Sequence, residues 1–424
     1  MKRIFKRVIA VTVVTSIICT MTACREKSKE IRAKDLMQGV EVQKLDDEIK
    51  EVDVGKSELI TDFAVRLFQA SINHEKDEKN LLVSPLSVMY ALAITANGAK
   101  DTTLNEMETV LGMEIGQLNQ YLKNYNDNLP QDEHYKLKLA NSVWFTDHPR
   151  FEVNRDFLKT NGLWYNASIY KAPFDETTCD DINLWVNEKT DGMISDILDE
   201  IPEAAVMYLV NALAFDAEWS SKYKKSEVRE GVFTSEDGTD YTVDFMHSEE
   251  MNYFEDEMAT GFMKYYKGGK YAFVALLPKE DVGLNEYIDS LTGAHITKLL
   301  ENPQSITVFA SMPKFKSEYN VEMSEVLKEM GMPEAFDGNK ADFTGLGTST
   351  EGNIFINRVL HKTFIEVNET GTKAGAATVV EMTDECAMEI IDYKTVNLDR
   401  PFVYMLIDCE KNAPFFMGTI VNME

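Results

Sequence analysis

The side chains that most often perform catalysis are present in this sequence, but they do not form known catalytic or metal-binding motifs. The six histidines are scattered, at positions 74, 134, 148, 247, 295 and 361. They include no His-Glu-x-x-His pair and no zinc-type spacing. No Gly-x-Ser-x-Gly elbow marks a nucleophilic serine. Gly345-Leu346-Gly347 lacks the third glycine and the strand–helix context of a dinucleotide-binding loop. The sequence therefore indicates no enzyme site, no metal site and no cofactor.

Cys24 is the one cysteine whose neighbours predict a chemical modification. Residues 1–7 are basic, and the apolar run at 8–19 is too short to span a bilayer and is typical of a signal-peptide core. Met21-Thr22-Ala23 before Cys24 resembles the processing site of bacterial lipoproteins. The resemblance implies that residues 1–23 are removed and that Cys24 carries lipid on its sulfur and new amino group. An ordinary secretion signal with a nearby cysteine is the alternative.

Composition sets further limits on partners. Cys179, Cys386 and Cys409 are widely spaced, so no disulfide framework is predicted. The formal net charge of −28 argues against binding to nucleic acid and to polyanions such as heparin. Residues 24–57 are rich in Lys, Glu and Asp, which predicts a solvated tether ahead of the folded part.

A stretch of small residues, Glu369 to Thr378, follows a strong strand pattern at 364–367. It offers too little apolar area to be an ordinary core segment, and it has too little Gly and Ser for a flexible linker. If it became a strand, one face would carry small or β-branched residues throughout, at positions 372, 374, 376, 378 and 380. The composition suits a segment that is a loop in one state and a strand in another.

This stretch resembles the hinge of the serpin family. Its matching residues are Glu369, Gly371, Thr372, Ala374, Ala376, Ala377 and Thr378. Lys373 replaces the usual acid and Gly375 replaces an alanine, and both are expected to face outward in an inserted strand. A plain Ala/Gly-rich surface loop is the alternative for the motif taken alone.

The elements that must position the hinge are expected in one large α+β domain, residues 58–424, without an internal linker or repeat. The resemblance implies the serpin fold: a large central mixed sheet, flanking helices and an exposed reactive loop. Helices are expected at 58–74, 88–97 and 181–197, with Ser87 placed to cap the second and Gly192 ending a turn within the third. Strands are expected at 80–84, 139–145, 209–215, 270–278, 306–313 and 364–367, with a C-terminal hairpin at 400–407 and 413–418.

Several residues in these elements match family positions around the opening of the main sheet. The resemblance implies that Ser84, Ser87, Asn211 and His361 form the shutter, and that Trp219 marks the point where loop insertion starts. The alternatives are a helix cap, satisfied buried polar residues and a large packing residue. Neither reading gives His361 a catalytic role.

The resemblance implies an inhibitor that acts as a suicide substrate of serine proteases, with cysteine proteases as the alternative target. Family spacing from Glu369 places the bait bond sixteen positions on, at Glu385-Cys386. The interval to Pro401 looks longer than in familiar relatives, so Met388 and Ile390 are alternatives. A non-inhibitory serpin acting as a binding or scaffold lipoprotein is the second hypothesis. We expect a monomer held at the outer face of a bacterial membrane by its lipid, and release from the membrane by shedding is the alternative.

Overall fold

A computed structural model describes residues 30–42, 56–75, 79–129, 134–201, 206–372 and 392–423. Ile31–Glu424 form one compact unit, and the account below concerns that unit. Within these described residues no helix is long and apolar enough to cross a bilayer.

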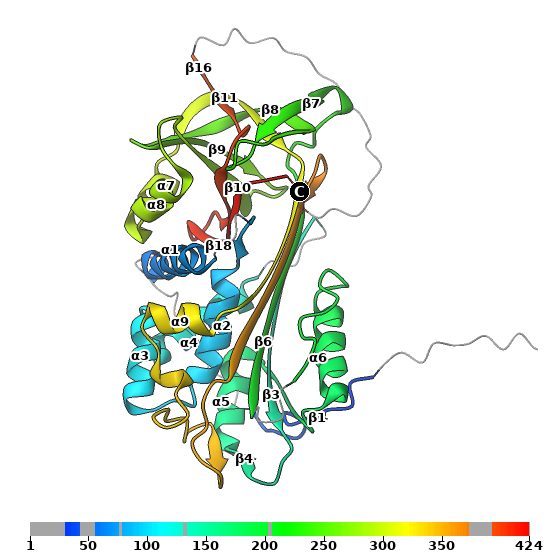
Figure 1. Cartoon of the computed structure of the whole chain (residues 1–424), viewed down its shortest axis with the longest axis vertical. Helices are drawn as coiled ribbons and strands as arrows, with labels where there is room; N and C mark the ends of the chain where they lie inside the picture. Colours follow the sequence, from blue (N-terminus) through cyan, green and yellow to red (C-terminus); the bar gives the residue numbers. More distant parts are fainter. Residues whose placement is uncertain are drawn as a thin grey trace, which may run out of the picture. The chain divides into compact units, whose positions relative to one another are not determined.

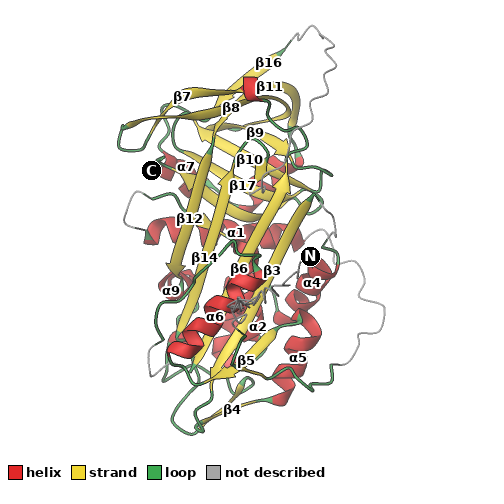
Figure 2. Cartoon of the chain, turned by 90° about the vertical axis from the view of Figure 1, so that its right-hand side faces the viewer, coloured by secondary structure: helices red, strands yellow, loops and turns green. Residues whose placement is uncertain are grey.

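The first layer is a mixed sheet in which seven strands of the described chain follow the order β1-β5-β3-β6-β15-β14-β12. Their bounds are β1 Lys34–Asp35, β5 Ser168–Ala172, β3 Tyr135–Thr146, β6 Met207–Glu218, β15 Gly371–Thr372, β14 Arg358–Val367 and β12 Phe315–Glu322. Figure 2 shows β5, β3, β6, β14 and β12 of this sheet side by side. β3 runs parallel to β5, and β14 runs parallel to β6, whereas the other neighbours are antiparallel. This is the large mixed sheet that the sequence predicted, and we call it the seven-stranded sheet.

A second sheet contains nine described strands in the order β16-β11-β8-β9-β10-β17-β18-β2, with β7 paired to β8. The bounds are β16 Tyr393–Asn397, β11 Gln304–Pro313, β8 Asp240–Glu255, β9 Ala259–Tyr265, β10 Tyr271–Pro278, β17 Phe402–Asp408, β18 Ala413–Ile420, β2 Leu82–Val83 and β7 Val228–Thr234. Every residue of β10, β17 and β18 is buried, as their near-continuous apolar sequences require. The antiparallel pair β17–β18 confirms the predicted C-terminal hairpin. A short pair, β4 Phe151–Val153 and β13 Gly347–Ser349, stands apart from both sheets.

Helices cover both faces of the seven-stranded sheet. α6 lies on one face, and α2 and α5 lie on the other (Figure 1). Alternate residues of β6 supply the two cores: Tyr208 and Val210 pack with α6, while Leu209 and Leu213 join the larger core. The helices are α1 Lys56–His74, α2 Pro85–Ala96, α3 Asp101–Leu111, α4 Ile115–Asp127, α5 Arg155–Tyr165, α6 Glu176–Lys189, α7 Leu284–Ser290, α8 Gly293–Glu301 and α9 Ser324–Met330.

The limits of α2 and α6 differ from the sequence-based prediction, and α6 begins earlier than predicted, at Glu176 rather than at 181. α2 begins at Pro85, and its N-cap is Ser84, whose hydroxyl accepts a hydrogen bond from the Ser87 amide; the assignment of the cap to Ser87 was wrong. Proline at the first helical position explains the earlier start. α6 ends at Lys189 rather than 197, because Asp191 and Gly192 adopt left-handed backbone conformations with φ of 51° and 76°.

Candidate functional site

The hinge begins inside the seven-stranded sheet. Gly371 and Thr372 form β15, which pairs antiparallel with Glu218 and Ala217 of β6 on one side and with Val367 of β14 on the other. Thr372 is 1% exposed. The remaining matched hinge residues lie outside the described residues, at Ala374, Ala376, Ala377 and Thr378, and so do the bait-bond candidates Glu385, Cys386, Met388 and Ile390.

Below β15 the sheet closes. Arg358–Lys362 of β14 pair directly and in parallel with Tyr208–Ala212 of β6. β15 thus occupies one end of a seam between two long strands that are joined to each other further along. A strand that extended β15 along this seam would separate the two strands and pair with both.

Gly371 has a steric reason to be glycine. A Cβ atom at this position would lie 2.0 Å from the Ala217 carbonyl oxygen and 2.9 Å from the Glu218 Cα. Both of these are backbone atoms of β6, so a side chain would force the two strands apart. The residue type that the hinge motif supplies is therefore the one that lets β15 enter the sheet.

Glu369 is fixed just before the strand. Its carboxylate lies 3.0 Å from the Lys314 ammonium, which also lies 3.2 Å from the carboxylate of Asp244. Partial burial alone would raise the pKa of Glu369, but a backbone hydrogen bond and the Lys314 charge outweigh it and hold the pKa below its usual value. Glu369 therefore anchors the turn through which the chain enters β15.

Trp219 lies directly at this turn, the base of the hinge, where the resemblance placed the start of insertion. Its backbone amide donates to the Thr370 carbonyl at 3.0 Å, and its indole Nε1 donates to the Asn368 carbonyl at 2.8 Å. The amide of Tyr223 donates to the Glu369 carbonyl at 3.0 Å. Three consecutive residues of the hinge base are thus held by the segment that follows β6.

The polar residues assigned to the shutter meet beneath the sheet, where α2 begins. Ser84, Ser87 and His361 are all fully buried. The Ser84 amide donates to His361 Nε2 at 3.0 Å, and the Ser84 hydroxyl donates to the Phe415 carbonyl at 3.0 Å. Asn211 pairs through its backbone with His361, and its side chain lies outside the described residues. The structure therefore brings Ser84, Ser87 and His361 together, joining β14, α2 and β18.

His361 is held as a neutral imidazole. Burial lowers its pKa from 6.5 to about 3, because a charged ring would lose its hydration. Nε2 accepts a hydrogen bond from Ser84, so the ring proton belongs on Nδ1, which finds no partner among the described side chains. The group can hold the strands together through hydrogen bonding but is not available as an acid at neutral pH.

The two described cysteines offer no reactive thiol. Cys179 is buried and donates to the Leu198 carbonyl at 2.9 Å, and burial raises its pKa. Burial also raises the pKa of Cys409, to about 12. In the described part of the chain, no group of three or more His, Cys, Asp or Glu side chains is arranged to hold a metal ion.

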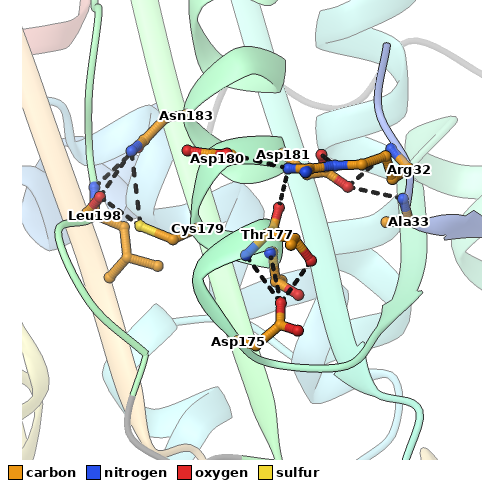
Figure 3. Close-up of polar contacts among 10 residues, drawn as sticks. Arg32, Ala33, Asp175, Thr177, Cys179, Asp180, Asp181, Asn183 and Leu198 are labelled. Carbon is orange, nitrogen blue, oxygen red and sulfur yellow. Dashed lines mark hydrogen bonds and ion pairs between the residues drawn. The ribbon is translucent and has the colours of Figure 1, made fainter. Parts of the chain in front are cut away.

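The sequence analysis did not predict that an N-terminal segment binds to the folded unit. Residues 31–42, which we assigned to the tether, lie along the folded unit, and Figure 3 shows Arg32 against α6. The carboxylate of Asp181 accepts hydrogen bonds from the amides of Arg32 and Ala33 at 2.8 Å and from Arg32 Nε at 2.9 Å. β1 of this segment covers the edge strand β5. The apolar residues that alternate with its charges were the available signal, namely Ile31, Ala33, Leu36, Met37 and Val40.

Comparison with known proteins gives a consistent result across the folded unit. A family model described as serpin (serine protease inhibitor) matches residues 58–423. An uncharacterized serpin-like protein of Thermococcus kodakarensis is 30% identical over 360 residues, covering 82% of this chain and 81% of the relative. The native-state structure of the thermophilic serpin tengpin is 46% identical with a TM-score of 0.87, covering 92% of this chain and 100% of that one. The latent-state structure of tengpin is 47% identical with a TM-score of 0.78, covering 88% of this chain and 100% of that one.

Proposed function

This chain belongs to the serpin family, and we propose that it is a suicide-substrate inhibitor of serine proteases. The observation that carries the proposal is the position of β15. Gly371 and Thr372, the start of the hinge, already lie between β6 and β14. A loop that enters the sheet at this point can lengthen the same strand once its far end is released.

The proposed chemistry is the first half of an ordinary protease reaction. The catalytic serine of the protease attacks the carbonyl carbon of the bait bond and forms an ester with the residue before it. The amide nitrogen takes a proton and leaves as the new amino terminus of the C-terminal segment. Before water hydrolyses the ester, the freed loop inserts into the seven-stranded sheet and carries the protease with it, which distorts the catalytic groups of the protease.

The sheet supplies a driving force for this insertion. The direct parallel pairing of Arg358–Lys362 with Tyr208–Ala212 would be exchanged for two antiparallel pairings, one on each side of the new strand. β15 already runs antiparallel to both neighbours. Antiparallel ladders are slightly more stable per residue than parallel ones, and the added strand contributes hydrogen bonds along its whole length. The uninserted fold is therefore expected to be the less stable of the two states.

The composition of the hinge supports insertion. Thr372, Ala374, Ala376 and Thr378 occupy alternate positions, which all face the same way in a strand. None is proline, charged or bulky, so the seam can close over them. This composition favours an inhibitor over a non-inhibitory serpin, whose hinge need not satisfy such a requirement.

The bait bond sets the class of target. With Glu385 before the bond, the target would prefer acidic residues and would need a cation or donors in its pocket. With Met388 or Ile390 there, the target would be an elastase-like or subtilisin-like enzyme with an apolar pocket. Cys386 would follow the bond in the first case.

The second candidate is a non-inhibitory serpin that serves as a surface binding or scaffold lipoprotein, and inhibition of a cysteine protease is a variant of the first. Cys24 lipidation, placement at the outer face of a bacterial membrane and a monomeric state belong to the same proposal. The signal-like residues 1–23 support the lipidation and the membrane placement. The strong negative charge disfavours nucleic acid as a partner.

A protease panel tests the proposal. Residues 25–424 would be mixed with a glutamyl-specific protease, an elastase, a subtilisin and a chymotrypsin, and each mixture would be run on a denaturing gel. Inhibition predicts a band at the summed mass, and the mass of the released peptide locates the bond. Thr372→Arg is the matched control, because it would bury an unpaired charge in the seam and should turn the inhibitor into a substrate. Cleavage by the panel without any adduct would favour the non-inhibitory alternative.

A further inference from the structure

Tyr266 brings a side chain of the nine-stranded sheet to the hinge. It follows β9, and its backbone forms an isolated bridge with Trp219. Its side chain is fully buried, and its hydroxyl is hydrogen-bonded to the hydroxyl of Thr372. This pair of hydroxyls therefore connects Tyr266 to the hinge at Thr372, the second residue of β15.

The ring of Tyr266 has little freedom to move. It is stacked on Trp219 with centroids 4.5 Å apart and planes at 10°, and it meets Phe215 edge-on at 5.0 Å. Trp219 itself donates hydrogen bonds to the carbonyls of Asn368 and Thr370. The hydroxyl of Tyr266 is consequently presented at a fixed point beside the hinge.

A buried ion pair also contacts this aromatic pair. The Lys264 ammonium lies 2.7 Å from the Glu250 carboxylate, and the two side chains are 3% and 12% exposed. The same ammonium lies 5.6 Å from the Trp219 ring and 4.4 Å from the Tyr223 ring. Cation–π attraction strengthens when water is excluded, so Lys264 holds together the rings of Trp219, whose indole binds the hinge base, and Tyr223, whose backbone amide binds it.

We propose that Tyr266 is a positioning residue for loop insertion, whose hydroxyl fixes Thr372 in the first pair of the new strand. The inference rests on the proposed inhibitory function. Insertion must outrun hydrolysis of the ester, and the first pair of a strand is formed against the entropy of closing a loop. Because Tyr266 and Thr372 hold that pair in advance, insertion starts from a formed end and has only to lengthen it.

The test removes single hydroxyls. Tyr266→Phe and Thr372→Val each delete one partner at nearly constant shape, and losing a hydrogen bond of ordinary strength changes an equilibrium about fivefold. We expect hydrogen exchange at Gly371 and Thr372 in the uncleaved chain to rise about fivefold in either variant. The number of inhibitor molecules consumed per protease trapped should rise severalfold, and the double variant should add little to either single one.

Tyr271→Phe is the matched control. Tyr271 is also fully buried, but its hydroxyl has no hydrogen-bond partner among the described residues, so this variant should behave like the parent chain. Unchanged exchange in Tyr266→Phe overturns the positioning role, and raised exchange with unchanged stoichiometry overturns its link to insertion. If the parent chain itself traps no protease, the proposed function fails, while the exchange measurement still decides whether Tyr266 positions the hinge.

Discussion

The burial of His361 predicts a specific dependence of stability on pH. The ring is fully buried at the junction of β14, α2 and β18, and its Nε2 accepts a hydrogen bond from the Ser84 amide at 3.0 Å. Burial lowers its pKa from 6.5 to about 3. Protonation would place a charge in the core and an added N–H against the Ser84 donor, so the native state resists it.

The sign and size of this change in the free energy of unfolding follow from the linkage between folding and proton binding. Between pH 6.5 and pH 3 the unfolded chain binds a proton at His361 that the native chain does not, so stability falls as the pH falls. The slope for one such group approaches about 1.4 kcal/mol per pH unit, and the full cost is about 5 kcal/mol. From pH 6.5 to pH 5.0 the loss is about 2 kcal/mol. Above pH 6.5 and below pH 3 this group adds no further dependence.

Urea unfolding followed by tryptophan fluorescence, from pH 7.5 to pH 5.0, measures the contribution of His361 to the pH dependence of stability. His361→Gln keeps an oxygen that can accept from Ser84 but does not titrate, so its free energy of unfolding should fall by about 2 kcal/mol less than that of the parent chain over this range. His148→Gln is the control, because His148 is exposed, and it should show the parent pH dependence.

Equal pH dependence in the parent chain and His361→Gln would refute the reasoning. If His361→Gln does not fold, the ring resonances of His361 in the parent chain decide the matter. We expect these resonances to stay constant from pH 7.5 to pH 5.0, and a midpoint near 6.5 would show that the ring is not buried as a neutral group.

Three further predictions concern the hinge and the N-terminal segment. Gly371→Ala should expel β15, because its Cβ would lie 2.0 Å from the Ala217 carbonyl oxygen; hydrogen exchange of the hinge base should rise, and protection equal to the parent chain would contradict the expected clash. Lys314→Ala should lower the free energy of unfolding by less than about 1 kcal/mol, because the carboxylate it pairs with at the hinge base is 42% exposed; urea titration at low and high salt measures this. Asp181→Ala should lower it by about 1 to 2 kcal/mol and increase proteolysis at residues 31–42, because the amides of this segment lose their acceptor; unchanged proteolysis would show that the segment is held by its apolar residues alone.

The hinge could be predicted from the sequence because its requirements are local. A strand that inserts between two neighbouring strands needs small residues at alternate positions. The residues from Thr372 to Thr378 have this periodicity. That Gly371 and Thr372 are already inserted could not be predicted, because it depends on Ala217, Tyr266 and the seam between two distant strands.

Other contacts could not be predicted from the sequence, because they join residues that are far apart along the chain. The acceptor of the N-terminal segment, Asp181, lies 149 residues from Arg32, and no local pattern connects them. No local pattern predicts the buried ion pair of Lys264, because its partners Glu250 and Tyr223 come from other segments. The end of α6 before Gly192, in contrast, could have been predicted, because a glycine often marks the left-handed turn that ends a helix.

The central claim is that the cleaved loop becomes a strand of the seven-stranded sheet, and thermal unfolding of the cleaved chain tests it most directly. The chain would be cut once within residues 373–391 by a panel protease that acts on it, and its unfolding temperature would be compared with that of the intact chain. Insertion replaces one parallel pairing by two antiparallel ones, so we expect the cleaved chain to unfold at a higher temperature than the intact chain. An unfolding temperature equal to or below that of the intact chain would contradict insertion and with it the inhibitory mechanism.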